Sequence, residues 1–140
     1  MAILGIDFGL KRTGVAFAGD ESAIAFPGPT FTGAEDDVVR QVAAEAAERG
    51  ADTIVVGLPR NMNGTEGEMS ARARAFADKL RGATGTEVAL WDERLTSRQA
   101  DQAMLGADLS RRKRRKRIDS MAAQLMLQSY LDSRERRGTE

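Results

Sequence analysis

The pattern of apolar and polar positions predicts three short strands at the start of the chain. Apolar runs at 2–7 and 13–19 are separated by a short polar turn. A third run at 22–26 ends at a Pro-Gly-Pro sequence, 27–29, which we interpret as the end of a strand. Because short links join the three runs, they are expected to form an antiparallel meander.

Further along the chain the periodicity changes, and helical spacing alternates with β-branched runs. Three sequences of the capping-box type begin at Thr32, Thr65 and Thr96, and each predicts the start of a helix. The expected elements are a helix ending at Gly50, a strand at 53–57, a helix from the second box, a strand at 87–91, a short helix from the third box to Gly106, and a last helix at 118–134.

This order, three strands and then helices alternating with strands, predicts an α/β fold. Right-handed crossovers between the later strands make that half of the sheet parallel. We therefore expect a five-stranded mixed sheet, consisting of a three-strand antiparallel meander plus two parallel strands, with helices on both faces. A chain of 140 residues fits one such domain, 1–140.

Charge is distributed unevenly along a chain whose formal net charge is zero. There are 21 bases and 21 acids, but seven of the bases are consecutive, from Arg111 to Arg117. The remainder, with 14 bases against 21 acids, is therefore acidic. A basic block of this kind either binds polyanions or remains a solvated loop, and the sequence leaves both interpretations open.

The residue types that the chain lacks limit the catalytic and metal-binding chemistry that it can perform. The chain has no cysteine and no histidine, which excludes disulfides, thiolate nucleophiles, most zinc sites and any Ser-His or Cys-His pair. No run is apolar and long enough to span a bilayer, and the N-terminus lacks the basic region of a signal peptide. We therefore expect a cytoplasmic protein, in which a hydrolytic site would use carboxylates, hydroxyls or metal ions.

Acidic residues occur where ligands gather in an α/β sheet, at the carboxyl ends of strands. Asp7 follows the first strand, Asp92 and Glu93 follow the fifth, and Asp119 lies on the apolar face of the last helix. Converging carboxylates need cations between them, and oxygen-only ligands suit Mg²⁺ or Mn²⁺. Each acid also has a plainer interpretation, a turn cap for Asp7 and ion pairs with nearby arginines for Glu93 and Asp119. Whether Asp92 joins the site is left open.

Four separated motifs follow one another from Ile3 to Leu131: GIDFGLKRTGVA, VVGLPRNMNGTEG, WDERLTS and RKRIDSMAAQLMLQSYL. Together they resemble the YqgF family, whose members are described as Holliday-junction-resolvase-like proteins and as nucleases that process the 5′ end of pre-16S rRNA. The resemblance implies an RNase H-like fold and phosphodiester cleavage with divalent cations, Mg²⁺ or Mn²⁺, two of them in the expected mechanism. It assigns the catalytic and metal-binding acids to Asp7, Glu93 and Asp119.

Basic residues would bind the nucleic acid if the resemblance holds. Lys11, Arg12 and Arg94 lie at the expected edge of the site, where they would contact phosphates beside the scissile bond. The basic run would add an electrostatic attraction that weakens with salt; its members are Arg111, Arg112, Lys113, Arg114, Arg115, Lys116 and Arg117. No aromatic residue lies within this run, so recognition of backbone and shape is expected rather than base stacking.

Three other functions are compatible with the sequence. Asp7-x-Gly9 followed by Thr13-Gly14 also resembles the first phosphate loop of actin-like ATPases and sugar kinases, although those proteins close two such domains around the nucleotide. A non-catalytic RNA- or ribosome-binding factor would keep the fold and the basic run. A Holliday-junction resolvase would cleave branched DNA as a homodimer with two sites. We favour RNA as the substrate, on the family resemblance alone.

Overall fold

The computed structural model describes residues 2–19, 24–59, 65–92 and 111–138, and within the last segment it describes the side chains of 121–134. Its elements in chain order are β1 (Ala2–Asp7), β2 (Arg12–Gly19), β3 (Phe26–Thr32), α1 (Glu35–Arg49), β4 (Ala51–Leu58), α2 (Glu68–Thr84), β5 (Glu87–Asp92) and α4 (Arg111–Gly138). Every predicted strand except the third is confirmed, with ends that differ by no more than two residues.

The five strands form one mixed sheet in the order β3-β2-β1-β4-β5. β2 pairs antiparallel with both β1 and β3, whereas β4 pairs parallel with both β1 and β5. The predicted fold class, an antiparallel meander extended by two parallel strands, is therefore confirmed. β1, β4 and β5 point in the same direction, so their carboxyl ends lie along one edge of the sheet.

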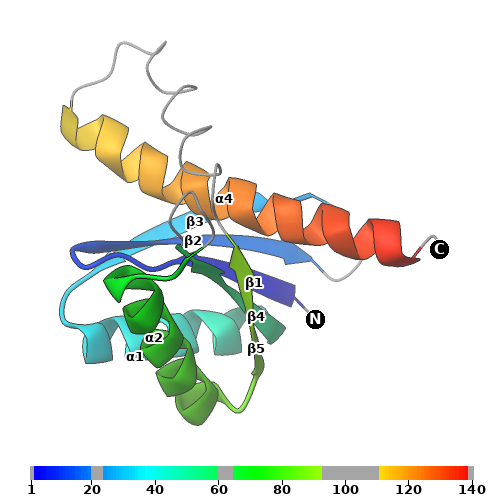
Figure 1. Ribbon diagram of the computed structural model, residues 1–140, viewed down its shortest axis with the longest axis horizontal. Helices are drawn as coiled ribbons and strands as arrows, with labels where there is room; N and C mark the ends of the chain where they lie inside the picture. Colours follow the sequence, from blue (N-terminus) through cyan, green and yellow to red (C-terminus); the bar gives the residue numbers. More distant parts are fainter. Residues whose placement is uncertain (1, 20–23, 60–64, 93–110, 139–140) are drawn as a thin grey trace.

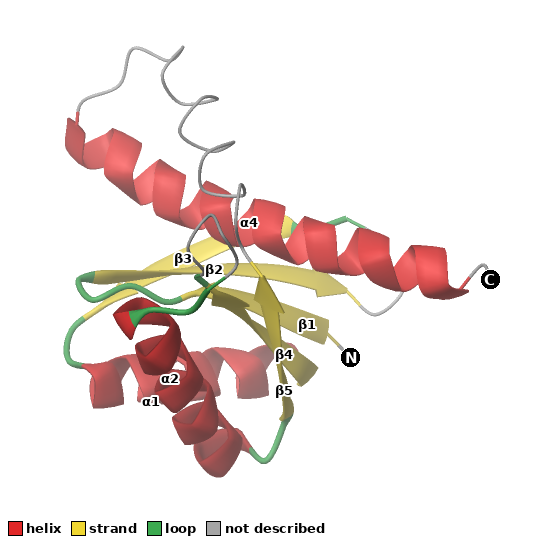
Figure 2. Ribbon diagram, in the orientation of Figure 1, coloured by secondary structure: helices red, strands yellow, loops and turns green. Residues whose placement is uncertain are grey.

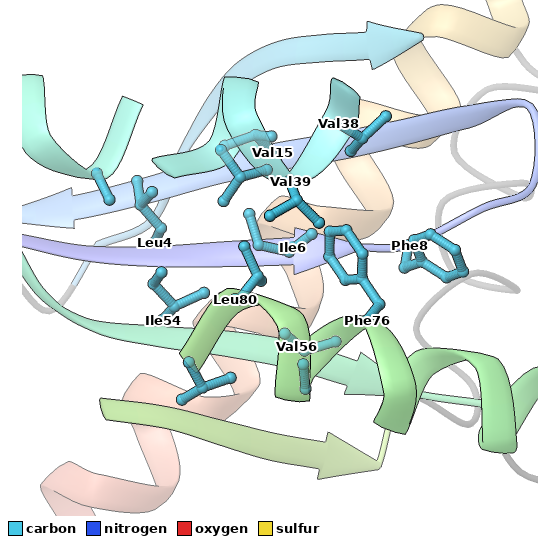
Figure 3. Close-up of a cluster of buried hydrophobic side chains, with 14 residues drawn as sticks. Leu4, Ile6, Phe8, Val15, Val38, Val39, Ile54, Val56, Phe76 and Leu80 are labelled. Carbon is cyan, nitrogen blue, oxygen red and sulfur yellow. The ribbon is translucent and has the colours of Figure 1, made fainter. Parts of the chain in front are cut away.

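Helices cover both faces of the sheet, with α1 and α2 on one face and α4 on the other (Figures 1 and 2). Alternation along β1 divides the buried side chains between the two faces. Leu4 and Ile6 belong to the same core as Phe76 of α2, and all three are labelled in Figure 3. Ile3 belongs to the second core, with Leu127 of α4. Odd-numbered positions of β1 therefore lie on the α4 face.

α4 approaches β1 very closely at Gly5. A Cβ placed on Gly5 would lie 2.8 Å from Cβ of Leu127, which leaves no room for a side chain. Glycine therefore lets the helix rest on the backbone of the strand. In Figure 1, α4 runs back along the sheet: its last turns lie near the N-terminus of the chain, and its first turns point towards the edge where β1 ends.

The prediction for the third strand is wrong. β3 spans Phe26–Thr32 instead of 22–26, and it contains the Pro-Gly-Pro sequence that was expected to end it. β3 is an edge strand that pairs only with β2, so a missing proline N–H costs no hydrogen bond on its outer side. The pairing with β2 shifts register opposite this sequence. Gly28 is required there, because a Cβ would lie 2.9 Å from the carbonyl oxygen of Val15.

Two of the predicted capping boxes are also wrong. α1 begins at Glu35 after Ala34 and α2 begins at Glu68 after Gly67, and neither preceding residue makes a side-chain cap hydrogen bond. The two glutamates instead lie at the first helical positions, where the helix dipole favours negative charge. The third predicted box, at Thr96, and the short helix expected after it lie outside the described residues.

The last helix is longer than predicted. α4 spans Arg111–Gly138, so it begins seven residues before the expected start at 118 and includes the whole basic run. Arginine and lysine are good helix formers, and salt screens the repulsion between exposed charges. The interpretation of the run as a loop is therefore wrong. None of the helices in the described segments has an apolar stretch that could cross a membrane.

Candidate active site

Asp7 is the last residue of β1 and lies at the carboxyl edge of the sheet, opposite Gly14 of β2. It follows Ile3 and Gly5 on the face that α4 covers. Its side chain is partly buried. The structure therefore places the first predicted site residue at the edge of the sheet where ligands bind in open α/β folds.

The turn that follows β1 is tightly constrained. Gly9 has no room for a side chain, because a Cβ would lie 2.3 Å from the carbonyl oxygen of Arg12. The backbone N–H of Gly9 donates a long, 3.5 Å hydrogen bond to Oγ1 of Thr13, whose side chain is fully buried. Phe8 stacks on Phe76 of α2, with ring centroids 4.5 Å apart. These contacts fix the carboxyl end of the strand.

Trp91 anchors the end of β5 to α4. Its indole N–H donates a 3.2 Å hydrogen bond to Oγ of Ser129, and its ring meets the ring of Tyr130 edge-on at 5.7 Å. From the sequence, Trp91 was interpreted only as the last residue of a strand, and its contact with α4 was not predicted. Trp91 is the single tryptophan of the chain and directly precedes the candidate acids Asp92 and Glu93. These two facts could have indicated that its side chain helps to position the end of β5.

Asp92 lies on the other face of the sheet from Asp7. Leu90, two residues earlier, packs against the core beneath α1 and α2, whereas Trp91 packs against the core beneath α4. Strand alternation gives Asp92 the same face as Leu90. The geometry therefore disfavours Asp92 as a member of the predicted site.

The other predicted acids are only partly described. Glu93 and Arg94 lie outside the described residues, and α4 is described at position 119 and along the basic run by its backbone alone. Among the side chains that the structure does describe, no three acids gather closely enough to bind a metal ion. Neither Glu93 nor Asp119 is among them, so the convergence of three acids stays a prediction.

The backbone of α4 gives position 119 a defined face. Ala122, Ala123 and Met126 are buried against the sheet, and helix periodicity places position 119 within about 60° of each of them. The prediction that this face of the helix is buried is confirmed.

The predicted basic residues lie at two places. Lys11 is exposed in the turn after β1, and Arg12, the first residue of β2, is partly buried; both lie at the same edge as Asp7. The basic run forms the first two turns of α4. Seven successive positions, about 100° apart, surround a helix axis completely. This stretch of α4 therefore has no apolar face with which to pack on the sheet.

Solved structures identify the class of fold. RuvC of Thermus thermophilus, in complex with a Holliday junction substrate, matches with a TM-score of 0.61 at 14% sequence identity, and the match covers 96% of each chain. Another Thermus thermophilus RuvC structure matches with a TM-score of 0.58. At these identities the likeness shows the fold alone, and the fold is RNase H-like, as predicted.

Related sequences identify the family. Residues 1–133 match the family described as "RuvX: Holliday junction resolvase". A protein of Pelotomaculum thermopropionicum is 47% identical over 97% of this chain and 90% of its own length, and one of Geobacillus kaustophilus is 46% identical over 96% and 99%. Both are named "Putative pre-16S rRNA nuclease". The protein is thus a nuclease, an enzyme that hydrolyses the phosphodiester bonds of nucleic acid. It belongs to the RuvX family, which confirms the resemblance to the YqgF family seen in its motifs.

Proposed function

We propose that the protein is a divalent-metal-dependent nuclease that processes the 5′ end of precursor 16S rRNA. The main structural support for this site is the position of Asp7. It is partly buried on the face of the sheet that α4 covers, at the edge where β1 and β5 both end. The choice of RNA is supported by near-full-length relatives whose name includes pre-16S rRNA. Family membership favours a nuclease over an actin-like ATPase or a sugar kinase.

Glu93 is proposed as the second acid of the site. Trp91 lies on the α4 face, which it shares with Asp7. Position 93 is two residues further along the chain, so continued strand alternation would give Glu93 this same face. The carboxylate needed at the end of β5 is therefore Glu93 and not its neighbour Asp92.

Asp119 is proposed as the third acid because of the way α4 rests on β1. Leu127 contacts Gly5, and Asp7 lies two residues, about 7 Å, further towards the carboxyl edge. α4 runs in the opposite direction, so residues before Leu127 lead to that edge (Figure 1). Position 119 is eight residues, about 12 Å, before Leu127. A carboxylate one helical turn beyond the level of Asp7 would close the site over the ends of the strands.

These ligands fit a hard divalent cation. All three are carboxylates, and the chain has no histidine or cysteine to bind a softer metal. Asp7, partly buried at a strand end, presents the kind of oxygen ligand that Mg²⁺ and Mn²⁺ prefer. We propose that the three acids hold two such ions. When bound, the ions would lower the pKa of the attacking water and stabilise charge on the leaving oxygen.

The basic residues are proposed to bind and orient the polynucleotide. Lys11, Arg12 and Arg94 would contact phosphates beside the scissile bond, since the first two lie at the start of β2, at the edge where β1 ends. The basic run, Arg111–Arg117, would neutralise phosphates further along the strand. Because this attraction comes from the release of counterions, it should weaken steeply with salt.

A Holliday-junction resolvase is the second candidate function. It is favoured by the description of the matched family and by the RuvC-like fold. An enzyme that cuts a four-way junction symmetrically presents two sites, so this function would require a homodimer. Membership of a nuclease family disfavours the remaining alternative, a non-catalytic RNA- or ribosome-binding factor. For each of them we propose a cytoplasmic location.

A cleavage assay separates these functions. The protein is incubated with a precursor 16S rRNA fragment, a four-way DNA junction and duplex DNA, with Mg²⁺ or Mn²⁺. We expect cleavage of the RNA to a 5′-phosphate and a 3′-hydroxyl, and its loss in EDTA or in Asp7→Asn. Asp92→Asn, the same change on the opposite face of the sheet, is the matched control that keeps activity.

Each other outcome of this assay has a defined meaning. Cleavage that persists in EDTA would overturn the metal-dependent mechanism. Preferred cleavage of the junction would favour the resolvase, and binding of RNA without any cleavage would favour the binding factor.

A further inference from the structure

Large hydrophobic side chains are exposed at both ends of the sheet. Among the described residues, Leu10, Ile24 and Phe26 are exposed by 58%, 59% and 47%. Ile24 and Phe26 follow β2, whose last residues pair with the first residues of β1. Leu10 lies at the opposite end, in the turn after β1. Of these three side chains, only that of Leu10 stands beside the proposed active site.

The turn that carries Leu10 has a fixed backbone. Gly9, directly before it, lies against the carbonyl oxygen of Arg12 so closely that no side chain would fit. The hydrogen bond from Gly9 to the buried Thr13 ties the start of the turn to β2. A side chain that is presented on a fixed backbone loses less entropy on binding than one on a mobile loop. Leu10 is therefore suited to contact a ligand.

The neighbours of Leu10 indicate which ligand it would meet. Lys11 is exposed next to it, and an ammonium group in this position attracts phosphate. Asp7 is three residues away, at most about 10 Å along the chain. A polynucleotide whose scissile phosphate lies at Asp7 would therefore bring an adjacent nucleotide to Leu10.

The apolar surface of a nucleic acid is the face of its bases. In a stacked helix these faces cover one another, and a protein meets base edges, sugars and phosphates instead. Apolar side chains reach a base face where the stack is opened, as the wedges of minor-groove-binding proteins do. Unpaired nucleotides in loops, bulges and ends offer the same surface.

We propose that Leu10 packs against an unstacked nucleobase next to the scissile phosphate. Through this contact it selects substrates that are unpaired or distorted at the cleavage position. The inference rests on the proposed nuclease function and adds a specificity-determining residue to it.

The test compares Leu10→Ala with Ile24→Ala, a change of an equally exposed side chain at the far end of the sheet. A hairpin RNA and a four-way DNA junction are each made with the base next to the mapped cleavage position either paired or mismatched. Removal of the leucine side chain should lower kcat/KM on the mismatched form about tenfold and abolish the preference for it over the paired form. Leu10→Met should restore most of the preference, and Ile24→Ala should match the wild type.

A second readout reports the unstacking itself. The nucleotide beside the cleavage position is replaced by 2-aminopurine, whose fluorescence rises when it leaves the stack. The Asp7→Asn protein is used, so that the substrate remains uncut. Its binding should raise the fluorescence, and the addition of Leu10→Ala should suppress the rise. Circular dichroism checks that each variant is folded.

The outcomes separate this inference from the function on which it rests. If the wild type cleaves but Leu10→Ala and Ile24→Ala give equal kcat/KM and equal fluorescence, Leu10 has no such role and the proposed function stands. If the wild type cleaves none of the substrates, the proposed function fails and the inference fails with it.

Discussion

Replacement of Gly5 and of Gly82 by alanine should change the stability of the protein in opposite directions. Gly5 lies in β1 beneath α4, where a new Cβ would be 2.8 Å from Cβ and 3.3 Å from Cγ of Leu127. Gly82 lies in α2, where a new Cβ would meet nothing within 4 Å. The same added methyl group therefore enters a filled interface at Gly5 and open space at Gly82.

The size of each effect follows from these distances. Carbon atoms in contact prefer separations of about 3.5–4.0 Å, so Gly5→Ala requires β1 and α4 to separate by roughly 1 Å. Leu127 is fully buried, and its Cβ cannot rotate away. Overpacking costs about 1–3 kcal/mol, and the ~0.5–1 kcal/mol by which alanine is preferred to glycine offsets part of it. At Gly82 only that gain of about 0.5–1 kcal/mol remains.

Urea denaturation followed by circular dichroism measures both changes. The midpoint should fall for Gly5→Ala and rise for Gly82→Ala, with melting temperatures that shift by about 4 °C per kcal/mol. Because α4 carries position 119, cleavage should also decrease in Gly5→Ala and remain normal in Gly82→Ala. If Gly5→Ala were as stable as Gly82→Ala, the close approach of α4 to β1 would be refuted.

The remaining predictions concern the proposed acids, the basic helix and a surface ion pair. Asp7→Asn should abolish cleavage but leave nucleic-acid binding, measured by gel shift, largely intact; cleavage at the wild-type rate would exclude Asp7 from the site. Four glutamines in place of bases within Arg111–Arg117 should flatten the slope of log Kd against log salt by about 0.7–0.9 for each phosphate that the protein no longer neutralises, with kcat unchanged. An unchanged slope would remove these residues from the interface. Lys79 donates hydrogen bonds of 2.7 Å to Glu35 and 3.0 Å to Asp36, and the second bond together with the charge of Lys79 lowers the pKa of the Asp36 carboxyl. The pair therefore stabilises the fold at pH values above the ordinary pKa of 3.8, and this stabilisation disappears as pH falls through the lowered value. Lys79→Met should lower the urea midpoint at neutral pH, and its difference from the wild type should shrink as pH falls below 3.8, whereas an equal decrease at every pH would contradict the pairing.

Hydrophobic periodicity predicted most of the fold, because buried residues recur at the helical spacing in the helices and at the strand spacing in the strands. Ala73, Phe76 and Leu80 recur at helical spacing and are all buried beneath α2. In β1, buried residues occur on both faces, as expected for a strand in the middle of a sheet that helices cover on both sides. Local pattern and tertiary packing agree in these segments, so the sequence alone was sufficient.

The errors arose where the tertiary position of a segment outweighs its local pattern. A Pro-Gly-Pro sequence usually ends a strand, but at the edge of the sheet β3 continues through it because one side of the strand needs no partner. The start of α4 was placed at 118 because the apolar periodicity begins there. A helix can, however, extend beyond the body it packs on, and residues that form helices well do not need an apolar face for this.

The sequence predicted at which edge of the sheet the candidate site lies, but it did not predict which face of the sheet each acid occupies. Asp7 was located correctly because the end of a strand is readable from the sequence. The strand pattern left the face of Asp92 open, because it depends on which side of β5 meets α4, and Glu93 was chosen through the family resemblance alone. The hydrogen bond of Trp91 to Ser129 supplies this information, and it joins residues 38 positions apart in the chain.

The distribution of charge favours one direction of approach for a polynucleotide. The basic run and position 119 belong to one continuous helix, so a strand that is held by the run lies within a few helical turns of the proposed third acid. Lys11 and Arg12 add positive charge at the end of β1. We therefore propose that the basic run attracts the polynucleotide first and that Lys11 and Arg12 contact it at the end of β1, beside the proposed acids.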